Sequence, residues 1–182
     1  MLACAATSWF STHRDIHAAN DFSWDPIKEV ALLFIGIFLT MIPALAFLAE
    51  AARSGAIPLD SPMQYYFATG SLSAFLDNAP TYLAFLSTSF GHYGLSVDNP
   101  AHMATYLAEH DHHLIGIALG AVFFGAGSYI GNGPNFMVKA IAERSDVNMP
   151  SFLGYIGKFS LPVLLPTLAI VALLFFSPWA LF

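Results

Sequence analysis

Charged side chains are scarce in this chain of 182 residues, of which only 10% are charged and 57% are hydrophobic. A soluble domain carries about 25% charged residues, so the composition excludes a soluble enzyme and a disordered chain. The net charge of −6 would repel phosphate, which excludes a nucleic-acid partner. The single cysteine, Cys4, excludes a disulfide scaffold and a cysteine-based zinc site. An integral membrane protein remains, surrounded by lipid bilayer and without enzymatic activity.

Two apolar runs are long enough to cross a membrane, which takes about 20 residues. They are residues 28–50, of which 30–49 carry no charge and include Pro43, and residues 159–179, which end at an interfacial Trp179. Residues 1–25 are polar, and we expect them to form a loop ahead of a membrane domain that covers residues 26–182. A chain of this length holds four or five membrane elements, which is few for a complete transporter.

Residues 62–90 form an apolar stretch with a polar interruption in its middle. The interruption runs from Asp77 to Pro80 and leaves two halves that are each too short to cross a bilayer. This pattern favours a re-entrant hairpin with Asp77 and Asn78 at its tip, because irregular backbone inside a membrane occurs where it lines a cavity. One long, kinked helix is the alternative.

Residues 114–142 are apolar and contain a second interruption. The glycine pair Gly116 and Gly120 favours close approach of a neighbouring helix. Further along, residues 131–135 read GNGPN, a sequence that disfavours continuous helix. We therefore expect a broken transmembrane helix that unwinds at these residues, a design typical of substrate and ion sites.

The connecting loops differ in positive charge. Residues 91–113 contain no lysine or arginine, whereas residues 139–158 contain three. The positive-inside rule therefore predicts an external loop at residues 91–113 and a cytoplasmic loop at residues 143–158. The run from Glu109 to His113 has metal-ligand chemistry, but a solvated loop is favoured, with pH sensing by its imidazoles as a weaker possibility.

Asp77 is the residue most indicative of function. A lone carboxylate between apolar half-helices is expensive to bury, and burial favours its neutral form, so that it can exchange a proton for a cation. Asn78 and Thr81 add neutral oxygens, whereas the helix that starts near Pro80 would direct its positive end at an anion. Spacing alone leaves cation and anion open.

The second interruption supplies the other half of the candidate site. Asn132 and Asn135 each offer a donor and an acceptor beside exposed backbone at Gly131 and Gly133. Lys139 is either a membrane anchor or a charge partner for this site, and the anchor is favoured. The serines of these segments, among them Ser73 and Ser128, are expected to bond backbone or pack.

The two interruptions resemble those of the ion-transporter superfamily. The similarity is strongest at residues 73–81, which read SAFLDNAPT, and at residues 129–140, which read YIGNGPNFMVKA, and it extends from about Trp24 to the end. Within the superfamily, the chain is most similar to bacterial sodium:proton antiporters and citrate-transporter-like proteins. The resemblance implies an all-α membrane fold of two inverted repeats, in which ions bind between a hairpin tip and an unwound helix.

Carried over to this sequence, the resemblance assigns the ion- or substrate-binding residues as Asp77, Asn78, Thr81, Gly131, Asn132, Pro134 and Asn135. A candidate sodium site consists of Asp77, Asn78 and Asn132, and no cofactor is expected beyond the transported or coupling Na⁺ and H⁺. The chain corresponds to one repeat, the C-terminal one, so the other repeat comes from the same full-length chain or from a partner chain. A homodimer in the bacterial inner membrane, crossing it several times, is also expected.

Three functions remain open at this stage. Sodium:proton antiport is favoured, and cation-coupled transport of citrate or a dicarboxylate is the alternative. A membrane fragment that does not transport without its partner half is the third.

Overall fold

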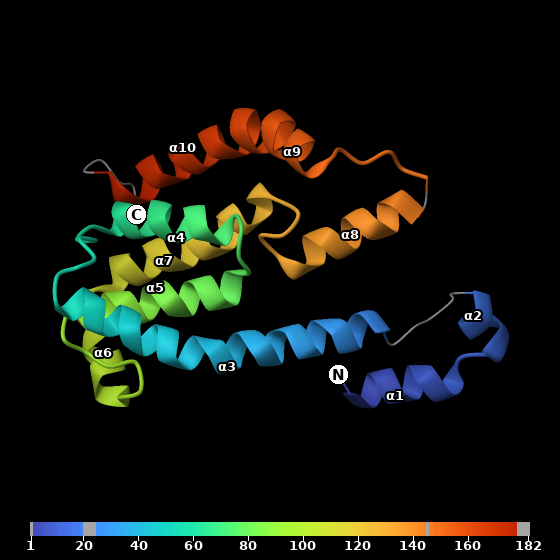
Figure 1. Ribbon diagram of the computed structural model, residues 1–182, viewed down its shortest axis with the longest axis horizontal. Helices are drawn as coiled ribbons and strands as arrows, with labels where there is room; N and C mark the ends of the chain where they lie inside the picture. Colours follow the sequence, from blue (N-terminus) through green and yellow to red (C-terminus); the bar gives the residue numbers. More distant parts are fainter. Residues whose placement is uncertain (1, 20–24, 145, 178–182) are drawn as a thin grey trace. The chain divides into compact units, whose positions relative to one another are not determined.

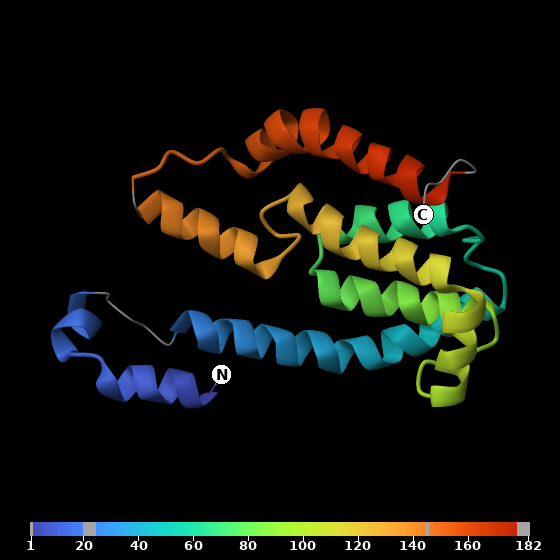
Figure 2. The same cartoon turned by 180° about the vertical axis from the view of Figure 1, so that it is seen from behind.

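The computed structural model describes residues 2–19, 25–144 and 146–177, and every regular element within these residues is a helix. The predicted all-helical class is therefore confirmed for this part of the chain. The chain divides into two compact units, Met1–Leu39 and Thr40–Phe182, and each is described by itself. Figures 1 and 2 show the helices from opposite sides, coloured along the sequence.

The first unit contains two short helices and the start of a long one. These are α1 (Leu2–Ser11), α2 (Arg14–Ala19) and the beginning of α3 (Asp25–Arg53). The expected loop over residues 1–25 is therefore wrong at α1 and α2, where alanine, the best helix former, outweighs the polar side chains. The predicted span 28–50 lies within α3, and Pro43 is inside this helix.

The second unit is built on three neighbouring helices, α4 (Pro62–Ser73), α5 (Asn78–His92) and α7 (Asp111–Phe124), which lie side by side in both views (Figures 1 and 2). Ser61 starts α4 with a capping box, in which its side chain accepts from the Gln64 amide and the Gln64 side chain accepts from the Ser61 amide. At 1.5 Å per residue, α4 and α5 are each shorter than the roughly 30 Å of a bilayer core.

Two glycines let α4 and α7 approach closely, as their spacing predicted. A Cβ atom added to Gly116 would lie 2.5 Å from the carbonyl oxygen of Pro62, and one added to Gly120 would lie 2.5 Å from that of Tyr66. Neither position has space for a side chain. The tyrosine ring of Tyr66 packs with Phe124 and Leu168 in the apolar core next to this contact.

The segment between α5 and α7 is more helical than an external loop at 91–113 implies. It contains α6 (Pro100–Glu109), which Asn99 caps by accepting from the Ala101 amide, and α7 already begins at Asp111. Tyr106 of α6 is fully buried and stacks on Phe90 of α5 at 4.1 Å between ring centroids. Packing of this apolar face keeps α6 on the bundle.

The C-terminal helix begins earlier than predicted. It consists of α9 (Phe152–Tyr155), the π-helix η2 (Ile156–Leu164) and α10 (Leu165–Phe176). Its start at residue 152 replaces the predicted start at residue 159, because Ser151 caps it by accepting from the Gly154 amide. Within the described residues, Phe152–Phe176 is the one helical stretch long and apolar enough to cross a membrane. The predicted anchor Trp179 lies outside the described residues.

Candidate functional site

The polar interruption at Asp77 is a turn between two helices. α4 ends at Ser73, α5 starts at Asn78, and residues 74–77 between them are named here the hairpin turn. Asp77 is the N-cap of α5, where its Oδ1 accepts from the Ala79 amide at 3.3 Å. Pro80 falls in the first turn of α5, where the missing amide hydrogen costs no helical bond. Two separate helices, rather than one kinked helix, therefore flank Asp77.

The second interruption lies earlier in the chain than predicted. α7 ends at Phe124, the short 3₁₀ turn η1 covers Gly125–Gly127, and α8 (Gly133–Arg144) follows after five non-helical residues. Residues 125–132 are named here the helix break. The prediction that Pro134 and Asn135 are unwound is wrong, because both lie in the first turn of α8, where proline's fixed φ suits a helix.

The hairpin turn and the helix break are in direct contact. Ser128 Oγ donates to the Ala74 carbonyl at 2.5 Å and accepts from the Gly131 amide at 3.1 Å. A Cβ atom on Gly131 would lie 2.8 Å from the Ser73 carbonyl oxygen and 2.9 Å from that of Ala74, so only glycine fits there. Glycine in the break is thus required by close backbone approach.

Asn78 makes the central polar contact between the two interruptions. The surrounding groups determine which end of the Asn78 amide is nitrogen and which is oxygen. The end that faces the carbonyl oxygens of Ala121 and Gly131 must be the nitrogen, because an oxygen there would face carbonyls that can only accept hydrogen bonds. With nitrogen there, it donates to the carbonyls of Ala121 and Gly131, both at 2.9 Å, and lies 3.0 Å from Ser73 Oγ. Ser73 Oγ itself donates to the Ala121 carbonyl at 2.5 Å. The expectation that Ser73 and Ser128 bond backbone is thereby confirmed.

Asn135 closes the helix break from its far side. Its Nδ2 donates to the carbonyls of Gly125 at 3.0 Å and Ser128 at 3.1 Å. Asn132 is half-buried, and its backbone carbonyl accepts from the Asn135 amide at 3.0 Å. Asn135 therefore already bonds two backbone carbonyls of the helix break, those of Gly125 and Ser128, which would otherwise be available to an ion.

Asp77 is half-buried and faces the start of α8. A Cβ atom on Gly133 would lie 3.8 Å from Asp77 Oδ2. The N-terminal ends of α5 and α8 therefore meet at this carboxylate, each bringing the partial positive charge of its unpaired amides. Pro134, next along α8, is exposed.

Thr81 has an unusual environment one turn further along α5. Its side chain is 1% exposed, and its Oγ1 forms no hydrogen bond with the part of the chain that the structure describes. A buried hydroxyl without a partner costs free energy, so such a group marks either a strained position or one that meets a ligand. The Thr81 hydroxyl is thus a predicted site oxygen that is buried and available to bind a ligand.

Lys139 is engaged away from Asp77. Its Nζ lies 2.6 Å from Glu143 Oε1 and 5.5 Å from the centroid of the Tyr129 ring. The ion pair is an i,i+4 pair on α8, and the ring contact is a cation–π interaction. A charge partnership with Asp77 is therefore not formed in this conformation.

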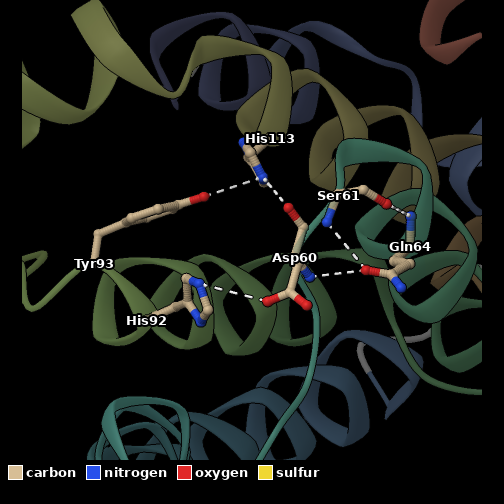
Figure 3. Close-up of polar contacts among 6 residues, drawn as sticks. All are labelled: Asp60, Ser61, Gln64, His92, Tyr93 and His113. Carbon is tan, nitrogen blue, oxygen red and sulfur yellow. Dashed lines mark hydrogen bonds and ion pairs between the residues drawn. The ribbon is translucent and has the colours of Figure 1, made fainter. Parts of the chain in front are cut away.

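A polar cluster lies at the end of the hairpin away from the hairpin turn (Figure 3). His113 Nε2 is 3.2 Å from the Asp60 carbonyl oxygen and 3.2 Å from the Tyr93 hydroxyl, and His92 Nε2 is 3.7 Å from Asp60 Oδ1. Burial lowers the pKa of His113, and the nearby His92, His110 and His112 add to the effect. Asp60 was not singled out from the sequence, since no motif marks it.

These histidines and carboxylates do not form a metal site. Within the described residues, no group of three or more histidine, cysteine, aspartate or glutamate side chains is arranged to hold a metal ion. Instead, His110 stacks on Tyr93 with ring centroids 3.6 Å apart, and Gln64 and Ser61 complete the polar contacts around Asp60. His110 and His113 thus take part in ring stacking and hydrogen bonding with Tyr93.

Comparison with known proteins gives one match. A protein-family model with the description "Putative citrate transport" matches residues 1–176, which is nearly the whole chain. No curated protein and no solved structure matches. The match covers both the hairpin turn and the helix break.

Proposed function

Because the chain belongs to this citrate transport family, we propose that it is the membrane-embedded part of a secondary transporter that moves a carboxylate such as citrate together with a coupling cation. The substrate would cross without covalent change, so the protein would not act as an enzyme. The alternative from the sequence, cation-coupled citrate transport, thereby takes precedence over sodium:proton antiport.

The observation that carries this proposal is the meeting of two helix N-termini at the hairpin turn. α5 begins at Asn78 and α8 at Gly133, and Asp77 Oδ2 lies close to both starts. Half-helix N-termini in transporters point at anionic groups of the substrate, because the amides and the helix dipole favour negative charge. A citrate carboxylate fits this chemistry better than a cation alone does.

Asp77 supplies the charge for the coupling ion. Its carboxylate would hold Na⁺ or H⁺ beside the substrate anion, and thus offset the repulsion between two negative groups. The Thr81 hydroxyl, buried and without a hydrogen bond in the described residues, is a neutral oxygen one turn further along the same helix. The amide nitrogens of Asn78 and Asn135 hold the backbone of the two interruptions, and a cation would be bound by their side-chain oxygens.

The membrane arrangement follows the same proposal. Phe152–Phe176 would cross the bilayer, and α4 and α5 would enter it only partway as a re-entrant hairpin. Positive charge near Lys158 would place the start of the crossing helix in the cytoplasm of a bacterial cell. A second, inverted unit would complete the substrate site from the opposite side of the membrane.

Uptake of radiolabelled citrate into proteoliposomes that contain the complete transporter, this chain together with its second, inverted unit, tests the proposal. With the protein, an inward Na⁺ or H⁺ gradient should drive uptake above that of empty vesicles, and Asp77→Asn should abolish the dependence on the gradient. Asp98→Asn is the matched control, since Asp98 is exposed in the segment before α6. Equal uptake by wild type and Asp77→Asn would contradict the role of Asp77, and no uptake by wild type would contradict citrate transport.

One observation favours sodium:proton antiport as a second candidate. In the described part of the chain, no lysine or arginine forms an ion pair with Asp77, so no basic side chain there competes with Na⁺ for this carboxylate. Antiport predicts that adding Na⁺ dissipates a pH gradient across the vesicle membrane in the absence of citrate. Dissipation that requires citrate would instead favour coupled uptake.

A further inference from the structure

Four consecutive backbone carbonyls of the helix break accept hydrogen bonds from side chains. Asn135 donates to the first and last of them, Gly125 and Ser128. The two between them belong to the C-terminal helix: Tyr155 OH donates to the Ala126 carbonyl at 3.0 Å, and Ser160 Oγ donates to the Gly127 carbonyl at 2.7 Å. Side-chain bonds thus replace the helical bonds that these carbonyls lose where α7 ends.

The π-helix η2 puts the two hydroxyl donors in register. Tyr155 and Ser160 are five residues apart, and on an α-helix they would point about 140° away from each other. A π-helix joins residues i and i+5, and the Leu165 amide bonds the Ser160 carbonyl in that pattern. The wider turn brings Tyr155 and Ser160 toward one side, where they reach adjacent carbonyls.

Packing alone does not fix this part of the break. An open apolar cavity of about 260 Å³ lies beside the contact of Ser160 with Gly127, and Ser128 is also among its lining residues. Gly127 also has no side chain to anchor it. The Ala126–Gly127 backbone is therefore held by the two hydroxyl bonds together with the close approach of Gly127 to Ala74, since a Cβ atom on Gly127 would lie 3.3 Å from the Ala74 Cβ.

The C-terminal segment has one more contact with the break. Tyr129 OH donates to the Pro150 carbonyl at 3.2 Å, and the rings of Tyr129 and Tyr155 lie 4.7 Å apart. Tyr129 directly follows Ser128, which bonds Ala74 in the hairpin turn. Contacts thus run from the C-terminal segment along the break to the hairpin turn, where Asp77 lies.

We propose that Tyr155 and Ser160 are positioning residues that hold the helix break in the shape required for binding the coupling cation at the hairpin turn. This inference rests on the proposed function, which supplies the cation site at the hairpin turn. The contacts described above show how the helix break is held. Neither residue touches substrate. Releasing the Ala126 and Gly127 carbonyls lets the break relax into the neighbouring cavity and moves its contacts with Asn78 and Ala74.

The first test is hydrogen exchange, which does not depend on transport. The full chain in detergent is compared with Tyr155→Phe, Ser160→Ala and the double variant, and with Thr167→Val as the matched control. Thr167 lies on the same helix and donates only to its own Val163 carbonyl. We expect faster exchange at the amides of Ile130 and Gly131, which bond Ser128 Oγ, in the double variant and not in the control. Unchanged exchange at these amides overturns the proposal.

The second test measures the Na⁺ concentration that gives half-maximal citrate uptake. It should rise about tenfold in the double variant, as expected for the loss of two hydrogen bonds, with maximal uptake changed by less than about twofold. Ser160→Thr as a single change keeps the hydroxyl and should have the wild-type Na⁺ requirement. Faster exchange with an unchanged Na⁺ requirement would overturn the positioning role.

Failure of the proposed function is distinguishable from failure of this inference. If the wild type takes up no citrate, exchange at Ile130 and Gly131 is measured in NaCl and in KCl. Protection by Na⁺ that the double variant loses supports the positioning role without transport, and protection equal in both proteins overturns it.

Discussion

The amide nitrogen of Asn78 lies 2.9 Å from the carbonyl oxygen of Gly131, and this contact joins the two interruptions of the chain. Asn78 is the first residue of α5, and Gly131 lies in the helix break before α8. Residues 53 positions apart in sequence thus bring the start of one half-helix against the start of another. The carboxylate of Asp77 is held where they meet.

Replacing Asn78 by alanine should destabilise the protein. The substitution removes the Asn78 donor from the Gly131 carbonyl, whereas the Ala121 carbonyl keeps its bond from Ser73 Oγ, and an unsatisfied buried acceptor costs about 1–3 kcal/mol. We expect a lower midpoint of thermal unfolding in detergent for Asn78→Ala. Asn148→Ala, at an exposed position, should leave the midpoint unchanged. Equal midpoints for both variants would show that the Asn78 amide does not join the two segments.

Gly120→Ala should separate α4 from α7. The added Cβ would lie 2.5 Å from the Tyr66 carbonyl oxygen, and backbone cannot move aside as a flexible side chain can. Such overpacking costs typically about 1–3 kcal/mol. The measurement is again the thermal midpoint, with Gly36→Ala as the control, because a Cβ there meets no atom within 4 Å. Gly36→Ala should instead stabilise α3 slightly, since alanine is the better helix former.

Protein stability should fall as the pH drops below the ordinary pKa of histidine. Burial lowers the pKa of His113 from 6.5, so the folded state binds its proton less readily than the unfolded state does. The stabilisation is fully present above about pH 6.5 and is lost progressively as the pH falls toward the lowered pKa. Thermal midpoints measured from pH 8 to pH 5 should therefore decline, and His113→Gln should reduce the decline.

The control for this pH dependence is His112→Gln, in which a neighbouring but exposed imidazole is removed. Its midpoints should follow those of the wild type across the same pH range. If His112→Gln and His113→Gln reduce the decline equally, the pH dependence arises from the general charge of residues 109–113 rather than from burial of His113.

The interruptions were predictable from sequence because proline, glycine and a lone carboxylate are incompatible with a continuous apolar helix. Asp77 marks the N-cap of α5, and Gly116 with Gly120 marks the close contact of α4 and α7. Local chemistry is enough for such features. The ends of the helix break were placed wrongly, since a proline that disrupts helix interiors, such as Pro134, is well tolerated in a first turn.

The contacts that fasten the break could not be read from the sequence. Ser160 lies in an apolar run, and nothing local indicates that the helix around it is a π-helix or that its hydroxyl reaches Gly127, 33 residues away. Asp60 similarly meets His113 only because α4 and α7 pack together. Tertiary packing decides such pairs, and a pattern of residue types along one segment carries no information about them.

Thr81→Val should raise stability and impair function. Valine has nearly the shape of threonine, and replacing the buried Oγ1, which forms no hydrogen bond with the described residues, removes the cost of about 1–3 kcal/mol of an unsatisfied hydroxyl. We therefore expect a higher thermal midpoint. If this oxygen meets the coupling cation beside Asp77, the same change raises the Na⁺ concentration for half-maximal citrate uptake. Thr88→Val is the matched control, since that equally buried hydroxyl already donates to the Ala84 carbonyl at 2.8 Å. Its loss should lower the midpoint slightly and leave the Na⁺ requirement unchanged. A Thr81→Val protein that is more stable and has the wild-type Na⁺ requirement would remove Thr81 from the site.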